Sequence, residues 1–154
     1  MMRYLLLLSF LIPLSVYSQN KLGKSRQQLT NELNQSVKNG QFAKAEFDEI
    51  KNRLVVSSRD SSGQGFRYEY GFDEKTGNCN TEMIISTCET CVRNLLNELL
   101  AVTSYQWKKI NESQYVSRFE DHLLIEWQQT GNEFSFTLIR TAWTRELYNM
   151  MKEK

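Results

Sequence analysis

Hydrophobic positions recur along the chain at helical spacing in two places. The first set predicts a helix over residues 25–37, and its members are Leu22, Leu29, Leu33 and Val37. Ser25 is placed to act as the N-cap of this helix, with Gln28 three residues later as in a capping box. A second, more strongly amphipathic helix is expected after Thr87, which is its predicted N-cap. Its apolar residues are Cys91, Val92, Leu95, Leu96, Leu99, Leu100 and Val102.

Alternation of apolar and polar residues predicts the strands. The clearest case is the segment 66–72, in which every second residue is aromatic, a period typical of a half-buried strand. Segment 79–86 is expected to return as another strand after a hairpin loop. Further strands are expected from residue 54 and over residues 105–110, 115–119, 123–127 and 134–139. Residues 41–50 fit either a short helix or a loop, residues 57–65 form a predicted turn, and residues 143–152 are a candidate terminal helix.

The order of these elements predicts the fold class. A helix and three strands are followed by a second helix and three or four strands. Such runs favour an α+β domain with one antiparallel sheet of about six or seven strands and two main helices on one face. The two halves share this plan without a repeat at the level of residues.

The first residues have the features of a cleavable secretory signal. Arg3 gives a positive start, an apolar run ends near Leu14, and Val16 and Ser18 occupy the positions before a cut near Ser18/Gln19. The apolar run has about a dozen residues, whereas a bilayer-spanning helix needs about 20. We therefore expect residues 1–18 to be a signal peptide and residues 19–154 to be a single globular domain, exported to the periplasm or beyond. No membrane span is predicted in the mature chain.

The charge balance limits the classes of partner. The whole chain has 19 basic and 18 acidic residues, and Arg3 is the one charged residue of the leader. The remainder is therefore neutral, which argues against nucleic acid and against anionic lipid. The expected partner is a protein or a small ligand, and no cofactor is predicted.

Three cysteines offer the sharpest local chemistry. Cys88 and Cys91 form a Cys-x-x-Cys motif that follows a strand and opens a helix, an arrangement that lowers a thiol pKa in redox pairs. A structural disulfide between two of Cys79, Cys88 and Cys91 is expected in an exported protein, with the pairing open. Thiol–disulfide exchange is less favoured, because Pro13 is the only proline and the mature chain can have no cis-proline. His122 would complete a zinc-binding set, but it lies in a distant hairpin, so no metal site is predicted.

The aromatic alternation has two interpretations. Either the stripe packs beneath the helices, or it forms an exposed platform for a sugar or a protein partner. Its members are Phe66, Tyr68, Tyr70 and Phe72. Burial of the two tyrosines distinguishes the interpretations.

Several short motifs support a resemblance. Gly23-Lys24-Ser25 before the first helix, the aromatic strand, an acidic turn at 73–74 and Cys79 together resemble uncharacterised small exported proteins of Bacteroidota, a similarity that implies no activity. The overall plan, with residues 22–25 as its cue, also resembles β-lactamase inhibitor proteins and small outer-membrane-assembly lipoproteins. The Gly-Lys-Ser lacks the upstream glycine and strand of a phosphate-binding loop, which excludes a nucleotide site of that kind.

These observations favour an exported, non-catalytic binding or accessory protein, with no catalytic residues assigned. One alternative is a thiol–disulfide enzyme that uses Cys88 and Cys91. Another is an inhibitor or immunity-type partner protein, suggested by the resemblance in fold alone.

Overall fold

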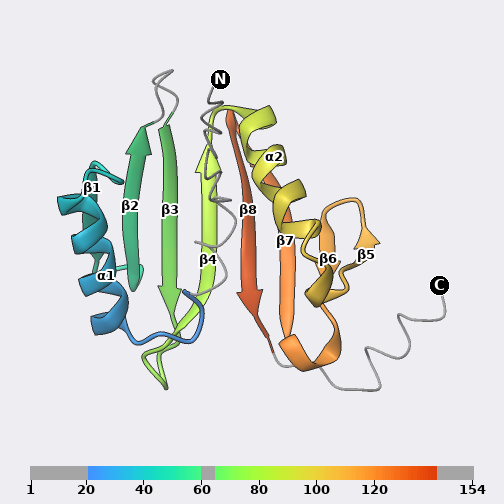
Figure 1. Cartoon of the computed structure of the whole chain (residues 1–154), viewed down its shortest axis with the longest axis horizontal. Helices are drawn as coiled ribbons and strands as arrows, with labels where there is room; N and C mark the ends of the chain where they lie inside the picture. The colour runs from blue at the N-terminus through green and yellow to red at the C-terminus, as the bar shows by residue number, and fades with distance from the viewer. Residues whose placement is uncertain (1–20, 60–64, 142–154) are drawn as a thin grey trace, which may run out of the picture.

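The computed structural model describes residues 21–59 and 65–141, and in these residues two helices pack on one face of an antiparallel sheet of eight strands (Figure 1). The first half contains α1 (Arg26–Lys38), β1 (Lys44–Asp48), β2 (Arg53–Arg59), β3 (Gly65–Phe72) and β4 (Cys79–Ser86). The second half contains α2 (Glu89–Leu100), β5 (Lys108–Asn111), β6 (Gln114–Val116), β7 (Leu123–Thr130) and β8 (Glu133–Arg140). Two short 3₁₀ helices, η2 (Thr103–Tyr105) and η3 (Phe119–Asp121), flank β5 and β6.

The sheet joins the two halves at its centre. Its strand order is β1-β2-β3-β4-β8-β7-β6-β5, so the last strand of each half lies beside the last strand of the other. Strands β4 and β8 are antiparallel, with Ile84 opposite Phe136. Each half is thus a helix followed by a four-stranded meander, and the two meanders meet at the β4–β8 seam.

Each half has its own hydrophobic core beneath its helix. Leu29 and Leu33 of α1 pack on the first half of the sheet, and three residues of α2, including Val92, pack on the second half. Leu22 and Tyr68 contact both cores. The junction between the cores therefore lies along the central strands.

The predicted fold class is confirmed, but the predicted strand count is too low. The structure has an α+β arrangement with one antiparallel sheet and both helices on one face, but the sheet has eight strands and not six or seven. The missed strand is β1, within the segment expected to be a helix or a loop. Ala45 and Phe47 do alternate inward, but Lys44, Glu46 and Asp48 surround them. Five residues with so many charges give too weak a period-two signal.

The capping box of α1 is confirmed. The backbone N–H of Gln28 donates to Ser25 Oγ, and the backbone N–H of Ser25 donates to Gln28 Oε1. The N-cap of α2, in contrast, is Cys88 and not Thr87. The sulfur of Cys88 accepts the backbone N–H of Cys91 and takes the role expected of the threonine hydroxyl.

Three further boundaries differ from the predictions. Strand β2 continues to Arg59, into the expected turn. Tyr105 belongs to η2 and not to a strand, because Gln106 has a left-handed backbone conformation that ends the helix before β5 begins. Strand β6 ends at Val116, and Phe119 starts η3.

Some predictions fall outside the described residues. The signal peptide and the terminal helix at 143–152 lie there entirely. Within the described ranges, neither α1 nor α2 has the length and apolar character needed to cross a bilayer.

Candidate functional site

The aromatic stripe lies on the helix-bearing face of the sheet. Tyr70 is 2% exposed, and Phe72 is also buried in the first core. Phe66 and Tyr68 are partly buried and pack against the cores. Tyr68 also makes an edge-to-face contact with Phe42, with ring centroids 5.6 Å apart. This placement gives the stripe a packing role at Tyr70 and Phe72 and counts against an exposed platform.

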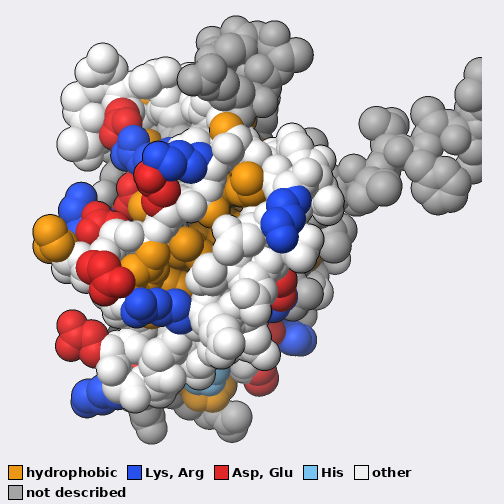
Figure 2. Space-filling view, turned by 90° about the vertical axis from the view of Figure 1, so that its left-hand side faces the viewer, with side chains coloured by type: hydrophobic (Ala, Val, Ile, Leu, Met, Phe, Trp, Pro, Cys, Tyr) orange, Lys and Arg blue, Asp and Glu red, His pale blue; other side chains and the backbone are white. Residues whose placement is uncertain are grey.

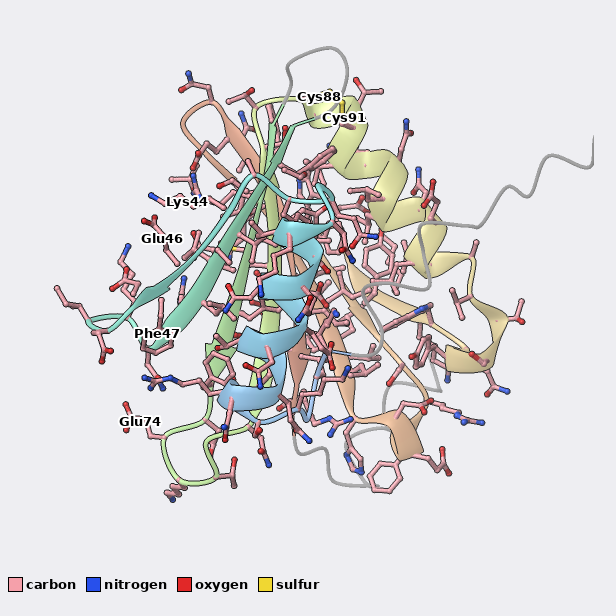
Figure 3. All side chains as sticks on the ribbon, turned by 60° about the vertical axis from the view of Figure 1, so that its left-hand side comes forward. Lys44, Glu46, Phe47, Glu74, Cys88 and Cys91 are labelled. Atoms are coloured by element: carbon pink, nitrogen blue, oxygen red, sulfur yellow. A yellow bond between two sulfur atoms is a disulfide. The ribbon has the colours of Figure 1, made fainter. Side chains whose placement is uncertain are left out.

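The free edge of the sheet at β1 carries charged side chains. Figure 2 faces this side and shows a strip of hydrophobic side chains bordered by charged ones. Lys44 and Glu46 form an ion pair on the short edge strand and project away from it (Figure 3). The Arg26 guanidinium lies 3.6 Å from the centroid of the Phe47 ring and partly covers it. Short, charged edge strands discourage pairing with another chain, so this edge is a poor docking strand.

The face of the sheet opposite α1 and α2 carries a chain of ion pairs that runs from β2 through β3 and over β4 to β8. Arg53 Nη1 lies 2.8 Å from Glu69 Oε2, Arg67 Nε lies 3.0 Å from Glu69 Oε1, and Arg67 Nη1 lies 3.0 Å from Glu133 Oε1. Arg67 is opposite Ile85, so its pair with Glu133 crosses β4 above that side chain. Ile85 is thereby buried on the face opposite α1 and α2. The two arginines and two glutamates of this chain therefore neutralise one another.

Two of the three cysteines are joined. Cys88 and Cys91 form a disulfide with a Cα–Cα distance of 5.3 Å, at the N-terminal end of α2 (Figure 3). Both residues are partly exposed. Of the pairings left open by the sequence, the structure contains this one, and Cys79 is a buried free thiol.

A buried polar cluster lies beside Cys79 at the central seam. Glu82 is 2% exposed, and its carboxyl group is hydrogen-bonded to the Tyr70 hydroxyl. Burial, with a further contribution from Glu82, raises the pKa of the Cys79 thiol to about 12. Burial and the same carboxylate raise the pKa of Tyr70 well above its usual range. Cys79 is therefore an unreactive thiol, unlike an activated nucleophile.

A pocket of about 180 Å³ opens at the opposite end of the molecule from the disulfide, where β8 ends in Figure 1. Its floor is formed by Leu22, Leu123 and Leu138, and the two leucines from the sheet are buried. Its walls come from Tyr105, Glu120, Asp121 and Arg140. The pocket thus combines an apolar floor with charged and hydroxyl groups from η2, η3 and β8.

The pocket walls carry opposite charges near the Tyr105 hydroxyl. Burial raises the pKa of this hydroxyl, the Asp121 carboxylate raises it further, and the Arg140 guanidinium lowers it. Asp121 is already paired, since its Oδ2 lies 2.6 Å from Arg118 Nε. None of the ion pairs and side-chain hydrogen bonds within the described ranges involves Arg140 or Glu120. These two groups remain available to a ligand.

Gly23 helps to place Arg140. Its φ of +88° is disfavoured for other residues, and a Cβ at this position would lie 2.8 Å from Arg140 Nη1. The backbone N–H of Gly23 donates to the Cys79 carbonyl, which ties this turn to the start of β4. The neighbouring residues also have structural roles, because Lys24 pairs with Glu32 and Ser25 caps α1. The Gly-Lys-Ser motif therefore supports one wall of the pocket.

His122 does not join any of these groups into a metal site. It follows η3 with a left-handed backbone, and its ring lies 5.0 Å from that of Phe119. Its Nδ1 is buried without a hydrogen-bond partner. Among the described residues, no three His, Cys, Asp or Glu side chains gather as a metal ion would require.

Sequence reasoning missed the pocket, because its lining comes from segments far apart in the chain. Glu82 was also missed, although it shares the strand parity of Ile84, which faces the core. That parity is a signal available in the sequence. Comparison of the chain with family models, with curated proteins and with solved structures finds no match, so the function must be inferred from the site itself.

Proposed function

We propose that this chain is an exported, non-catalytic binding protein and that the pocket at the end of β8 is its ligand site. The observation that carries the proposal is the combination of an apolar floor with two charged groups, Arg140 and Glu120, that form no ion pair with other described residues. Arg67 on the opposite face of the sheet, by contrast, is held in ion pairs with Glu69 and Glu133. Convergent polar groups of this kind fix the orientation of a small ligand and give a site its specificity, and this pocket exposes more polar than apolar surface.

The composition of the pocket favours binding over catalysis. Its walls offer a guanidinium, two carboxylates and a phenol, and Asp121 is engaged by Arg118. Among the described residues, the lining includes no serine, cysteine or histidine to act as an activated nucleophile with its base. These groups orient and neutralise a ligand without an evident bond-breaking step.

Mapping of small-fragment binding on the ¹⁵N-labelled protein tests the proposal. A library of small organic acids, amines and amino acids is titrated, and backbone amide shifts are followed by NMR. The largest shifts are expected at Tyr105, Leu123, Leu138 and Arg140. A control variant, Leu22→Trp, enlarges the partly buried residue of the floor and should abolish them. Binding confined to other surfaces, or equal shifts in this variant, would refute the ligand site.

Export is the second part of the proposal. A disulfide is typical of proteins that function in an oxidising compartment, and the Cys88–Cys91 bond supports this placement. Expression of the full chain in a bacterial host, followed by mass spectrometry of the envelope fraction, tests it. We expect a product that begins at Gln19 and carries one disulfide. An uncut chain in the cytosol would contradict export.

Thiol–disulfide exchange is a second candidate, favoured by one observation: the partly exposed disulfide lies at the N-terminus of α2, where the helix dipole stabilises a thiolate. In such a reaction, a substrate dithiol loses two electrons and two protons and becomes a disulfide. Cys88 and Cys91 accept them and become two thiols. Oxidation of a reduced dithiol peptide, compared between the native protein and Cys88→Ala, tests this function. Equal rates in the two proteins would exclude it.

A further inference from the structure

The cationic wall of the pocket is the first clue to the ligand's chemistry. Arg140 is the last residue of β8, and its guanidinium reaches the pocket beside Gly23. A guanidinium presents several N–H donors in a planar fork that matches a carboxylate. With no carboxylate of the described residues paired to it, Arg140 is suited to bind one from a ligand.

The anionic wall is the second clue. Glu120 and Asp121 line the pocket from η3, and the salt bridge to Arg118 neutralises Asp121. Glu120 forms no ion pair among the described residues, and Arg118, a nearby cation, is already bonded to Asp121. A simple carboxylate ligand would leave Glu120 unmatched, whereas a ligand with a nearby ammonium group would pair with it.

The floor and the size of the pocket are the third clue. Leu22, Leu123 and Leu138 offer an apolar surface. The volume of about 180 Å³ corresponds to roughly a dozen water-sized spheres. This space suits a ligand with about ten non-hydrogen atoms, part of which is apolar.

We propose that the ligand is a free α-amino acid with an apolar side chain, its carboxylate on Arg140, its ammonium group toward Glu120 and its side chain on the leucine floor. This inference rests on the proposed function, because it names the ligand class of the same pocket. It differs from binding of an organic acid, an amine or a peptide terminus, each of which would use only one of the two charged walls.

Isothermal titration with L-leucine and two analogues tests the inference. The first analogue, 4-methylpentanoate, keeps the carboxylate and side chain but lacks the ammonium group. The second, 3-methylbutylamine, keeps the ammonium group but lacks the carboxylate. Because both protein charges lie at a partly exposed rim, each lost charge pair should weaken binding about fivefold. L-valine and L-methionine extend the series in side-chain size.

Two variants make the test specific to each wall. Arg140→Gln should weaken L-leucine and 4-methylpentanoate about fivefold and leave 3-methylbutylamine unchanged. Glu120→Gln should weaken L-leucine and 3-methylbutylamine and leave 4-methylpentanoate unchanged. Arg93→Gln on α2 and Glu46→Gln on the edge strand β1, which remove the same charges outside the pocket lining, are the matched controls and should change nothing.

The outcomes separate this inference from the proposed function. If 4-methylpentanoate binds as tightly as L-leucine, or none of the three amino acids binds, the amino-acid ligand is wrong. In that case, chemical-shift changes from fragments that map to the pocket would still support the pocket as a ligand site. If no fragment binds in the pocket either, both proposals fail together.

Discussion

Cys79 makes the folded protein sensitive to alkaline pH. The thiol has a pKa of 9.0 in an ordinary environment and about 12 in the folded protein. The folded state therefore holds the proton more tightly, and the unfolded chain loses its proton first as the pH rises. The stabilisation is complete below about pH 9 and is lost as the pH approaches 12.

The size of the effect follows from the two pKa values. Between pH 8 and pH 10.5, deprotonation in the unfolded state alone lowers the free energy of unfolding by about 2 kcal/mol. Tyr70 and Tyr68 also have raised pKa values, because both are buried. The Cys79→Ala variant keeps both tyrosines, so the difference between the two proteins in the pH dependence of unfolding free energy isolates the contribution of the thiol.

Urea denaturation at the two pH values provides the measurement. Both proteins should also carry Cys88→Ala and Cys91→Ala, so that an unfolded thiolate has no disulfide to attack. We expect the protein with Cys79 to lose about 2 kcal/mol more than the alanine variant over this range. Equal losses of unfolding free energy in the two proteins would contradict the burial of Cys79. Rapid alkylation of native Cys79 at pH 8 would contradict it as well.

Three further predictions concern stability. The double variant Cys88→Ala/Cys91→Ala should lose about 2 kcal/mol, the loop-closure value for about four residues, in urea denaturation; no loss would mean that the bond does not constrain the chain. Gly23→Ala should lose about 1 kcal/mol or more, because its φ is +88°, and an unchanged midpoint would contradict that backbone. Ser25→Ala should lose about 1 kcal/mol, whereas Ser25→Asp should keep the cap; equal losses in thermal unfolding would argue against capping.

The regular elements could be predicted because their patterns are long. Strand β3 alternates over its whole length, and α2 repeats its apolar spacing over three turns. The strand β1 could not be recognised, because its five residues include Lys44, Glu46 and Asp48. The short helix η2 was predicted as the start of a strand. Its left-handed C-cap is Gln106, whereas a glycine or asparagine at this position would have indicated a helix end.

The candidate site could not be predicted, because it depends on which strands become neighbours. Pairing of β4 with β8 joins residues about 50 positions apart and brings Leu22 and Gly23 beside the end of β8. No local motif marks Arg140 or Glu120. Which described charges remain without an ion pair depends on the tertiary structure, which the sequence pattern does not give.

The most direct test of the ligand site is a crystal structure of the chain from Gln19 onward, soaked with a cocktail of small acids, amines and amino acids. Ordered density is expected on Leu123 and Leu138, with a carboxylate within hydrogen-bonding distance of Arg140. Fragments bound only on other surfaces, with water alone above these leucines, would show that the cavity is not a binding site.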